Sequence, residues 1–396
     1  MNLPGLKTRG LLCFLLLSFS AAAQKAGRIH NKAVLIDGHN DVTSASIVEG
    51  RDITQSQPDR HTDLIRWKKG GLDVQFFSVF TGPVARNPKG VYADANDQID
   101  SLEALVRRHP RQMMLAGSYK EIKKGINEKK LVALIGVEGG HMIEDNLDKL
   151  DALQKRGMRY LTLTWNNSNS WATSALDETL HADTLKHKGL TDFGRSVVRR
   201  LNQLGVLVDL SHTGEQTFYD AIAASTKPVI LSHSSVYNLC PVFRNVKDDQ
   251  IRAVAKNGGV VCINFYSGFI SRKFDEKLTS FSEPAKKHFV DSVSRQTGDS
   301  LRALRQWNTY TKKELEAVRP TISDVVDHID YIVKLVGDDY VGIGSDYDGI
   351  GSVPIGLEDV STYPNITLEL LKRGYTKRSI RKILGGNILR VIRASF

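Results

Sequence analysis

The stretch VLIDGHNDV, residues 34–42, joins a short apolar run to a histidine and an aspartate that are separated by one residue. A β-branched run of this kind predicts a buried strand. Alternate side chains of an extended chain point to the same side, so His39 and Asp41 leave the end of the strand together. An imidazole and a carboxylate placed in this way form half of a metal site, although a solvated pair would have the same spacing.

Similar apolar or β-branched runs recur along the chain, with amphipathic stretches between them. The expected strands, eight in all, span residues 34–38, 73–80, 131–138, 160–165, 206–211, 228–233, 260–265 and 340–346. The stretches TDFGRSVVRRLNQLG (191–205) and ISDVVDHIDYIVKLVG (322–337) are examples of the helices predicted between them. Strands that alternate with helices form parallel sheets with right-handed crossovers, and eight such units close into a (β/α)8 barrel of the TIM type.

Residues 1–23 differ in composition from the rest of the chain. Two basic residues precede the apolar stretch LLCFLLL, and three alanines at 21–23 offer small residues for cleavage, which is the pattern of a secretory signal peptide. The stretch is too short to span a bilayer, and no later one is long enough to do so. We therefore expect residues 24–396 to form one exported barrel domain without stable membrane insertion, most simply in a bacterial periplasm.

The interval 267–320 is too long for an ordinary connection between two strands, and it is rich in charged residues and serine. It predicts a partly helical insertion between the seventh and eighth strands. Such an insertion either shapes the substrate pocket or stands apart in solvent.

Charge and cysteine content exclude some classes of function. The formal net charge of +10 is spread along the chain among acidic residues, and no nucleic-acid motif is present, so no nucleic-acid partner is expected. Outside residues 1–23 only Cys240 and Cys262 remain. They permit one disulfide in an oxidising compartment, or two buried thiols, but they do not form a thiolate metal site.

Histidine or carboxylate residues follow five of the eight expected strands. In a parallel barrel the carboxyl ends of all strands lie on one face, where catalytic groups gather. Taken singly, each residue has an equally good structural role as a hydrogen-bonded buried side chain or a helix cap. Five strand ends of this kind predict a shared site, with His141 as a neighbour. The residues are His39, Asp41, Glu138, His212, His233 and Asp346.

The chemistry of these side chains favours particular metals. Three imidazoles and two carboxylates without a thiolate indicate a catalytic, zinc-like site that keeps positions open for water and substrate. Five ligands would crowd one ion, whereas two ions that share one carboxylate would each have three protein ligands. Glu138 is the expected bridge between the two ions. A water held between such ions ionises near neutral pH and becomes a nucleophile.

Nine motifs, in this order, resemble the renal-type membrane dipeptidases, a peptidase family with a binuclear zinc site among the amidohydrolase-like barrels. They are DGHND, GVEGGH, MRYLTLTWNN, LGVLVDLSH, PVILSHSS, CPVFRNVKDD, INFY, GIGSDYDG and GLEDVSTYP. The resemblance covers nearly all of the chain after residue 23 except the insertion. It implies two Zn²⁺ ions per chain and a dipeptide substrate, and it allows a homodimer, because family members often pair.

The resemblance also implies a role for individual residues. Arg244 matches the family's substrate-binding arginine, and Asp346 matches its acidic residue near the scissile bond. A guanidinium binds a carboxylate through two hydrogen bonds, and a carboxyl group beside a bridging hydroxide can carry a proton to the leaving amine. The metal ligands would be His39, Asp41 and Glu138 for one zinc, and Glu138, His212 and His233 for the other.

Trp165 departs from the family pattern. Mammalian members carry a histidine after LTLT, which helps to bind the substrate and the oxyanion. An indole donates one hydrogen bond but cannot become a cation, so oxyanion stabilisation is expected to rest more heavily on the metals. Trp165 and the asparagines that follow it, Asn166 and Asn167, either wall the pocket or offer amide donors. An exported zinc dipeptidase is the leading hypothesis, and an N-acyl amino acid deacylase or lactonase with the same metals is the alternative. A non-catalytic envelope protein that binds peptides or uses metal only for structure is less favoured, because structural zinc sites usually have four ligands, often thiolates.

Overall fold

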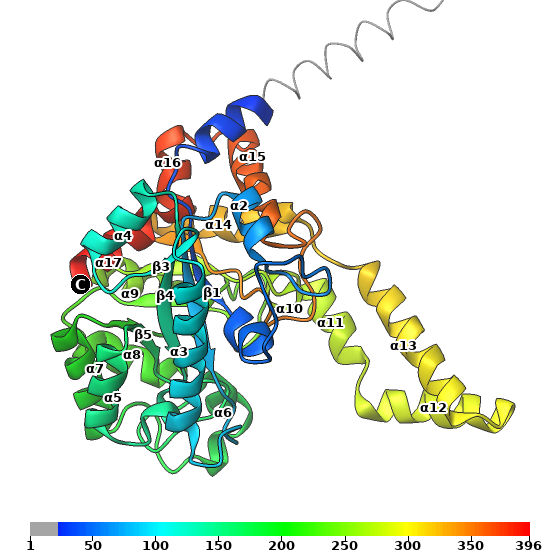
Figure 1. Ribbon diagram of the computed structural model, residues 1–396. Coiled ribbons are helices and arrows are strands. Elements are labelled where there is room, and N and C mark those ends of the chain that lie inside the picture. Colours follow the sequence, from blue (N-terminus) through cyan, green and yellow to red (C-terminus); the bar gives the residue numbers. More distant parts are fainter. Residues whose placement is uncertain (1–22) are drawn as a thin grey trace, which may run out of the picture.

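A closed barrel of parallel strands forms the centre of the computed structural model, which describes residues 23–396 (Figure 1). The order β2-β1-β9-β8-β7-β6-β5-β4, with β2 paired to β4, completes the ring. The predicted (β/α)8 barrel is therefore confirmed. The predicted signal peptide, residues 1–23, lies outside the described residues except for its last position. The barrel strands are β1 (Ile36–Asn40), β2 (Val74–Phe80), β4 (Leu131–Glu138), β5 (Met158–Thr162), β6 (Leu207–Asp209), β7 (Ile230–Ser234), β8 (Val260–Ile263) and β9 (Val341–Ile343).

A further short strand, β3 (Met113–Leu115), was not expected from the sequence. It pairs in parallel with the beginning of β4, where Met113 lies opposite Leu131. Three residues are too few for an alternating pattern to be recognised, so only the neighbouring strand defines β3. Because it flanks the start of β4, it leaves the carboxyl ends of the barrel strands free.

Helices surround the barrel, and their ends follow local capping rules. Thr191 accepts a hydrogen bond from the backbone of Gly194 at the start of α7 (Asp192–Leu204), and Gly205 ends that helix with a φ of 67°. The amphipathic stretches 191–205 and 322–337 are both helical, as predicted. The other helices of the barrel are α2 (Leu64–Gly70), α3 (Val91–Arg108), α4 (Tyr119–Asn127), α5 (Leu147–Lys155), α6 (Ala175–Leu180), α8 (Glu215–Ala224), α9 (Asp248–Asn257), α14 (Ile322–Val336), α15 (Pro364–Lys372), α16 (Lys377–Arg381) and α17 (Asn387–Ser395).

Glycine allows the barrel strands to approach closely below the mouth. A Cβ atom on Gly344, just past β9, would lie 1.8 Å from the carbonyl oxygen of Ser232 on β7. A Cβ atom on Gly136 of β4 would lie 2.0 Å from Cζ of Tyr160, whose ring fills the barrel interior. The interior is therefore packed, and the open space lies above it at the carboxyl ends of the strands.

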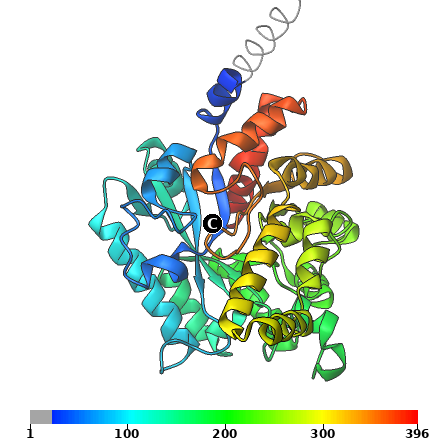
Figure 2. The same cartoon turned by 90° about the vertical axis from the view of Figure 1, so that its right-hand side faces the viewer.

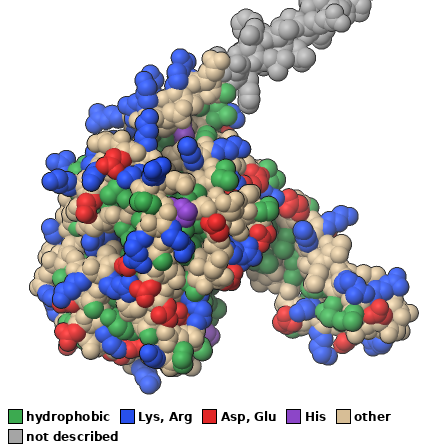
Figure 3. All heavy atoms as spheres, viewed as in Figure 1, with side chains coloured by type: hydrophobic (Ala, Val, Ile, Leu, Met, Phe, Trp, Pro, Cys, Tyr) green, Lys and Arg blue, Asp and Glu red, His purple; other side chains and the backbone are tan. Residues whose placement is uncertain are grey.

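The interval 267–320 is a helical insertion between β8 and β9, as predicted. It contains α10 (Ser267–Ile270), α11 (Arg272–Ser280), α12 (Glu283–Thr297) and α13 (Ser300–Glu316). The pair α12 and α13 extends away from the barrel as an arm, and Figure 2 views the molecule from the side of this arm (Figures 1, 2 and 3). Four aromatic rings pack within the arm and its base: Phe281, Phe289, Trp307 and Tyr310.

Within residues 23–396, no helix combines the length and the apolar character needed to cross a bilayer. Cys240 and Cys262 are both buried free thiols, so the disulfide that the sequence permitted is not formed. The thiol of Cys240 donates to the carbonyl oxygen of Gly268 at 3.3 Å. Burial raises the pKa of this thiol to about 12, which makes it a packing residue rather than a reactive one.

Candidate metal centre

The five side chains proposed as metal ligands lie together at the carboxyl ends of the strands. His39 belongs to β1 and Asp41 follows it; Glu138 is the last residue of β4. His233 lies in β7, and His212 is three residues beyond β6. All five are buried. Four segments far apart in the sequence thus contribute to one site.

Glu138 occupies the centre of this group. Its Oε1 atom lies 3.0 Å from Nε2 of His212 and 3.4 Å from Nε2 of His233. Its Oε2 atom lies 3.3 Å from Nε2 of His39 and accepts a hydrogen bond from Ser78 at 3.1 Å. One carboxylate oxygen therefore faces each half of the group, which is the arrangement that a bridging ligand requires.

Asp41 and Asp346 flank His39 on the other side. Nε2 of His39 lies 3.4 Å from Oδ2 of Asp41 and 4.0 Å from Oδ1 of Asp346. The side-chain amide of Asn264 donates to Oδ2 of Asp346 at 2.8 Å, which leaves Oδ1 directed toward the group. His39, Asp41 and Asp346 offer ligand atoms within 4.8 Å of one another, as do His39, Glu138 and His233.

Hydrogen bonds fix the tautomers of two histidines. Nδ1 of His212 lies 2.9 Å from Oδ1 of Asn166, which can only accept, so this nitrogen carries the proton. Ser232 donates its hydroxyl proton to Asp209 at 2.6 Å, and it therefore accepts from Nδ1 of His233 at 2.8 Å. The Nε2 atoms of the two neutral rings are consequently unprotonated.

These two unprotonated nitrogens lie only 3.0 Å apart. Two lone pairs at this distance, beside a carboxylate oxygen, repel one another unless a cation lies among them. Within the described residues, Nε2 of His39 and Oδ1 of Asp41 are buried and lack a hydrogen-bond partner. A pair of divalent cations would satisfy all of these atoms, so the donor set fits a metal centre.

The electrostatics of His212, His233 and Glu138 match the protonation states that metal ligands need. Burial and the charge of Arg244 lower the pKa of His212 to about 3. Burial and His39 lower the pKa of His233 well below its usual value. Although burial opposes it, the nearby charge of His39 holds the pKa of Glu138 well below its ordinary range. Neutral imidazoles and an ionised carboxylate are the forms that bind a metal. At His39 the shift is opposite: although burial opposes it, Tyr160, Glu138 and Asp41 hold the pKa of this imidazole well above its usual value.

A cavity of about 460 Å³ opens above these residues. Arg244 lines it, and its side chain is buried apart from a small exposed fraction of 5%. Within residues 23–396 the guanidinium makes one hydrogen bond, from Nη2 to the carbonyl oxygen of His233 at 3.3 Å, and it lies 5.4 Å from the ring of Phe269. Since a guanidinium has five N–H donors, most of them remain free for an anion in the cavity.

Trp165 forms an aromatic wall of the same cavity. Its ring lies 4.9 Å from the ring of Phe80 and 6.3 Å from that of His212. The insertion contributes to the opposite side through Phe269 of α10, whereas α11, α12 and α13 do not line this cavity. Each alternative for the insertion therefore holds for one part of it. Its first helix, α10, shapes the pocket, whereas the arm of α12 and α13 stands apart from it.

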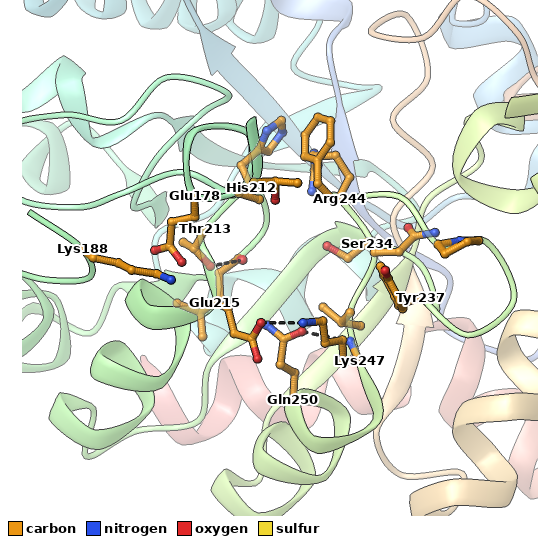
Figure 4. Close-up of a pocket in the computed structure, with 17 residues that line it drawn as sticks. Glu178, Lys188, His212, Thr213, Glu215, Ser234, Tyr237, Arg244, Lys247 and Gln250 are labelled. Carbon is orange, nitrogen blue, oxygen red and sulfur yellow. Dashed lines mark hydrogen bonds and ion pairs between the residues drawn. The ribbon is translucent and has the colours of Figure 1, made fainter. Parts of the chain in front are cut away.

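A second, polar cavity of about 260 Å³ adjoins the first (Figure 4). His212, Phe243 and Arg244 line both cavities. Figure 4 shows the ion pair between Glu215 and Lys247, at 2.6 Å, on the floor of the second cavity. Arg244 therefore stands at the boundary between two polar spaces.

Several residues that support the site were missed by sequence reasoning. Asp37 accepts hydrogen bonds from the backbone of His39 and from the backbone and hydroxyl of Ser345. Asp209 accepts from the backbone and hydroxyl of Ser232. The signal that could have identified them is the repeated pattern VLIDGH and VLVDLSH, in which a buried aspartate precedes each histidine. The others are Tyr160, Ser232 and Asn264. Nε2 of His141 contacts the carbonyl oxygen of Thr81 rather than a ligand.

Comparison with known proteins places this site in a family. The family described as membrane dipeptidase (peptidase family M19) matches residues 23–395. The chain is 25% identical to the probable dipeptidase PvdM from Pseudomonas aeruginosa, with a TM-score of 0.78 over 95% of this chain and 98% of that one. It shares its fold with a metallo peptidase from Rhodobacter sphaeroides, solved with a phosphinate mimic of the dipeptide L-Ala-D-Ala, at 20% identity and a TM-score of 0.73 over 92% of this chain and 99% of that one. The chain belongs to the membrane dipeptidase family, peptidase family M19, and is a metallo-dipeptidase of that family.

Proposed function

We propose that this protein is an exported dipeptidase that uses two Zn²⁺ ions bridged by Glu138. The observation that carries the proposal is the pair of unprotonated Nε2 atoms of His212 and His233, 3.0 Å apart and beside Oε1 of Glu138. His39, Asp41 and Glu138 would hold one ion, and Glu138, His212 and His233 the other. When bound, the ions supply an ionised water and polarise the peptide carbonyl group.

Arg244 would hold the C-terminal carboxylate of the dipeptide. A guanidinium can donate two parallel hydrogen bonds to a carboxylate, and burial strengthens such a pair. Phe269 packs against the guanidinium at 5.4 Å and limits its movement. The substrate would then lie with its C-terminal residue between Arg244 and the wall formed by Trp165 and Phe80.

Asp346 would move the proton that the reaction requires. Asn264 holds one oxygen of this carboxyl group at 2.8 Å, and the other oxygen is directed toward the metal ligands. A carboxylate in this position can accept a proton from the attacking water and deliver it to the leaving amine nitrogen. Trp165 cannot supply a cation to the oxyanion, so stabilisation of the oxyanion would rest more heavily on the metals.

The signal-peptide pattern in residues 1–23 supports export, and a periplasmic location is the simplest destination. Expression of the full chain in a Gram-negative host, followed by fractionation and N-terminal sequencing, tests this part. Recovery of a chain that begins at residue 24 in the periplasmic fraction is the expected result. An uncut chain in the cytoplasm would overturn it.

The activity is tested with purified residues 24–396 and a panel of dipeptides that includes D-residues at the C-terminal position. We expect hydrolysis that is lost with a chelator and restored by Zn²⁺. No hydrolysis of any dipeptide would refute the proposal. Because Trp165 stands where mammalian members carry a histidine, N-acyl amino acids and lactones belong in the same panel, and faster turnover of those compounds would favour the alternative hydrolase.

A further inference from the structure

The three histidines of the site differ in the partner that holds their Nδ1 atom. His212 is held by Asn166 at 2.9 Å and His233 by Ser232 at 2.8 Å. Both partners act as acceptors toward the ring: an amide oxygen has no proton to give, and the hydroxyl proton of Ser232 goes to Asp209. The tautomer that presents a free Nε2 lone pair is therefore fixed at both rings before any metal binds.

His39 has a different partner. Its Nδ1 atom lies 2.8 Å from the hydroxyl oxygen of Tyr160, a residue from β5 that is 121 positions away. A phenol can either donate or accept, and a small rotation of its O–H bond changes one role into the other. In one arrangement Nδ1–H donates to Tyr160 and Nε2 is free; in the other Tyr160 donates, and the proton sits on Nε2 facing Glu138 and Asp41 at 3.3 and 3.4 Å.

Packing holds Tyr160 in place without fixing its hydroxyl proton. The residue is fully buried, its ring lies over Gly136, and it packs at a tilt against Phe76 with 5.0 Å between the ring centres. The position of the oxygen is thus set by the barrel, and the direction of its hydrogen bond is set by what binds His39. An ion can bind Nε2 of His39 only when the ring is in one of its two tautomers. The rings of His212 and His233 are already in the required tautomer.

We propose that Tyr160 is a positioning residue for the His39–Asp41 position, which is the second of the two metal positions to fill and the more readily exchanged. The inference rests on the two-ion site proposed above. The His212–His233 position is already arranged for an ion and binds first. At the His39 position the phenol oxygen must act as an acceptor, which orients the ring and frees Nε2.

The test is a metal titration of chelator-treated residues 24–396 with Co²⁺ against a competing indicator, followed by absorption spectra. The wild type should bind in two steps. Tyr160→Phe should raise the dissociation constant of the weaker step by about 10- to 100-fold and leave the tighter step unchanged, since partners of this kind tune affinity by that amount. Asn166→Ala should weaken the tighter step instead. Tyr375→Phe, which loses a hydroxyl bond to Asp330 at 2.6 Å far from the site, is the matched control and should change neither.

A second measurement tests the order of filling without Tyr160. With one equivalent of Co²⁺, His39→Asn should give the wild-type spectrum, whereas His212→Asn should not. Equal weakening of both steps by Tyr160→Phe, no weakening, or the reverse pattern of spectra would each overturn the inference. A wild-type chain that binds a single ion would instead refute the two-ion site, so the two failures are distinguishable.

Discussion

Asp346 and His212 share a backbone conformation that residues with a side chain seldom adopt, with φ angles of 63° and 66°. Each lies three residues beyond the end of its strand, β9 for Asp346 and β6 for His212. The same left-handed turn at two places in the barrel directs both side chains into the mouth. Such a conformation costs about 1–3 kcal/mol and persists where the surroundings enforce it, often at functional sites.

Replacing Asp346 should separate backbone strain from chemistry. Asp346→Gly and Asp346→Ala both remove the carboxyl group, and kcat should fall by about 10²- to 10⁴-fold in each, which is the usual contribution of a general acid or base. Only glycine relieves the strained φ, so the chelator-treated Gly variant should melt at a higher temperature than the Ala variant. Equal melting temperatures would show that this turn is not strained.

Gly349 lies directly against the two aspartates of the site. A Cβ atom there would lie 2.1 Å from Oδ2 of Asp41 and 2.6 Å from Oδ1 of Asp346. Gly349→Ala should therefore displace both carboxylates and lower kcat/KM by about tenfold or more, because small misplacements of reacting groups are costly. A Cβ atom on Gly27, which does not line the cavity, would meet nothing within 4 Å, so Gly27→Ala is the control that should keep full activity. Similar rates for the two variants would contradict the geometry.

Arg244→Met should raise KM for dipeptides by about 10²-fold, since a buried charged hydrogen-bond partner of the substrate is lost. The effect on kcat should be small if Arg244 grips the carboxylate equally in the ground and transition states. Arg252→Met, on the exposed part of α9, should leave both constants unchanged. Dipeptide amides, which lack the carboxylate, should be insensitive to Arg244→Met. A comparable loss on amides would assign Arg244 another role.

The metal-free protein should lose stability as the pH falls. The pKa of His212 is lowered to about 3 in the folded chain, whereas an unfolded histidine titrates near pH 6.5. Between these values the unfolded state binds more protons, so the free energy of unfolding decreases as the pH is lowered. Chemical denaturation of chelator-treated protein from pH 7 to pH 4 measures the slope. His212→Gln should make the slope shallower, and an unchanged slope would contradict a neutral His212.

Trp165→His restores the side chain that mammalian family members carry. An imidazole can donate to an oxyanion, so kcat on ordinary dipeptides should rise by up to about tenfold, which is less than the roughly 10²- to 10³-fold that a single oxyanion donor can contribute. KM should also rise, because the contact of the indole with Phe80, at 4.9 Å between ring centres, is lost. Steady-state kinetics with Trp165→Phe as a control for ring packing separates these effects. Unchanged constants in the histidine variant would make Trp165 a packing residue only.

The barrel was predictable from the sequence because a short apolar or β-branched run marks each of its strands, and nearly all strand residues are buried. The strand bounds were less accurate: 160–165 was expected where β5 is Met158–Thr162, since the last residues of the run belong to the turn that carries Trp165. The strand β3 was missed because three residues show no period. Elements with a regular local sequence pattern could therefore be predicted. The strand β3, which is defined only by its pairing with β4, could not.

The candidate ligands were found because they directly follow apolar runs at equivalent places. Tyr160 could not be found in this way: it lies in the middle of a strand, and only the closure of the barrel brings it to His39. Asp209 looks like an ordinary residue of β6 until Ser232 of the next strand is placed beside it. Spacing along the chain identifies residues at strand ends, but contacts across the barrel require the fold.

The arm formed by α12 and α13 has a consequence for how the molecule behaves in solution. A body with a protruding helical pair has a larger Stokes radius than a sphere of the same mass (Figure 3). A monomer of this 44.0 kDa chain will therefore elute early from a gel-filtration column, at a volume that globular standards would assign to a heavier particle. Light scattering or sedimentation equilibrium, which report mass independently of shape, are the measurements that can distinguish a monomer from a pair of chains.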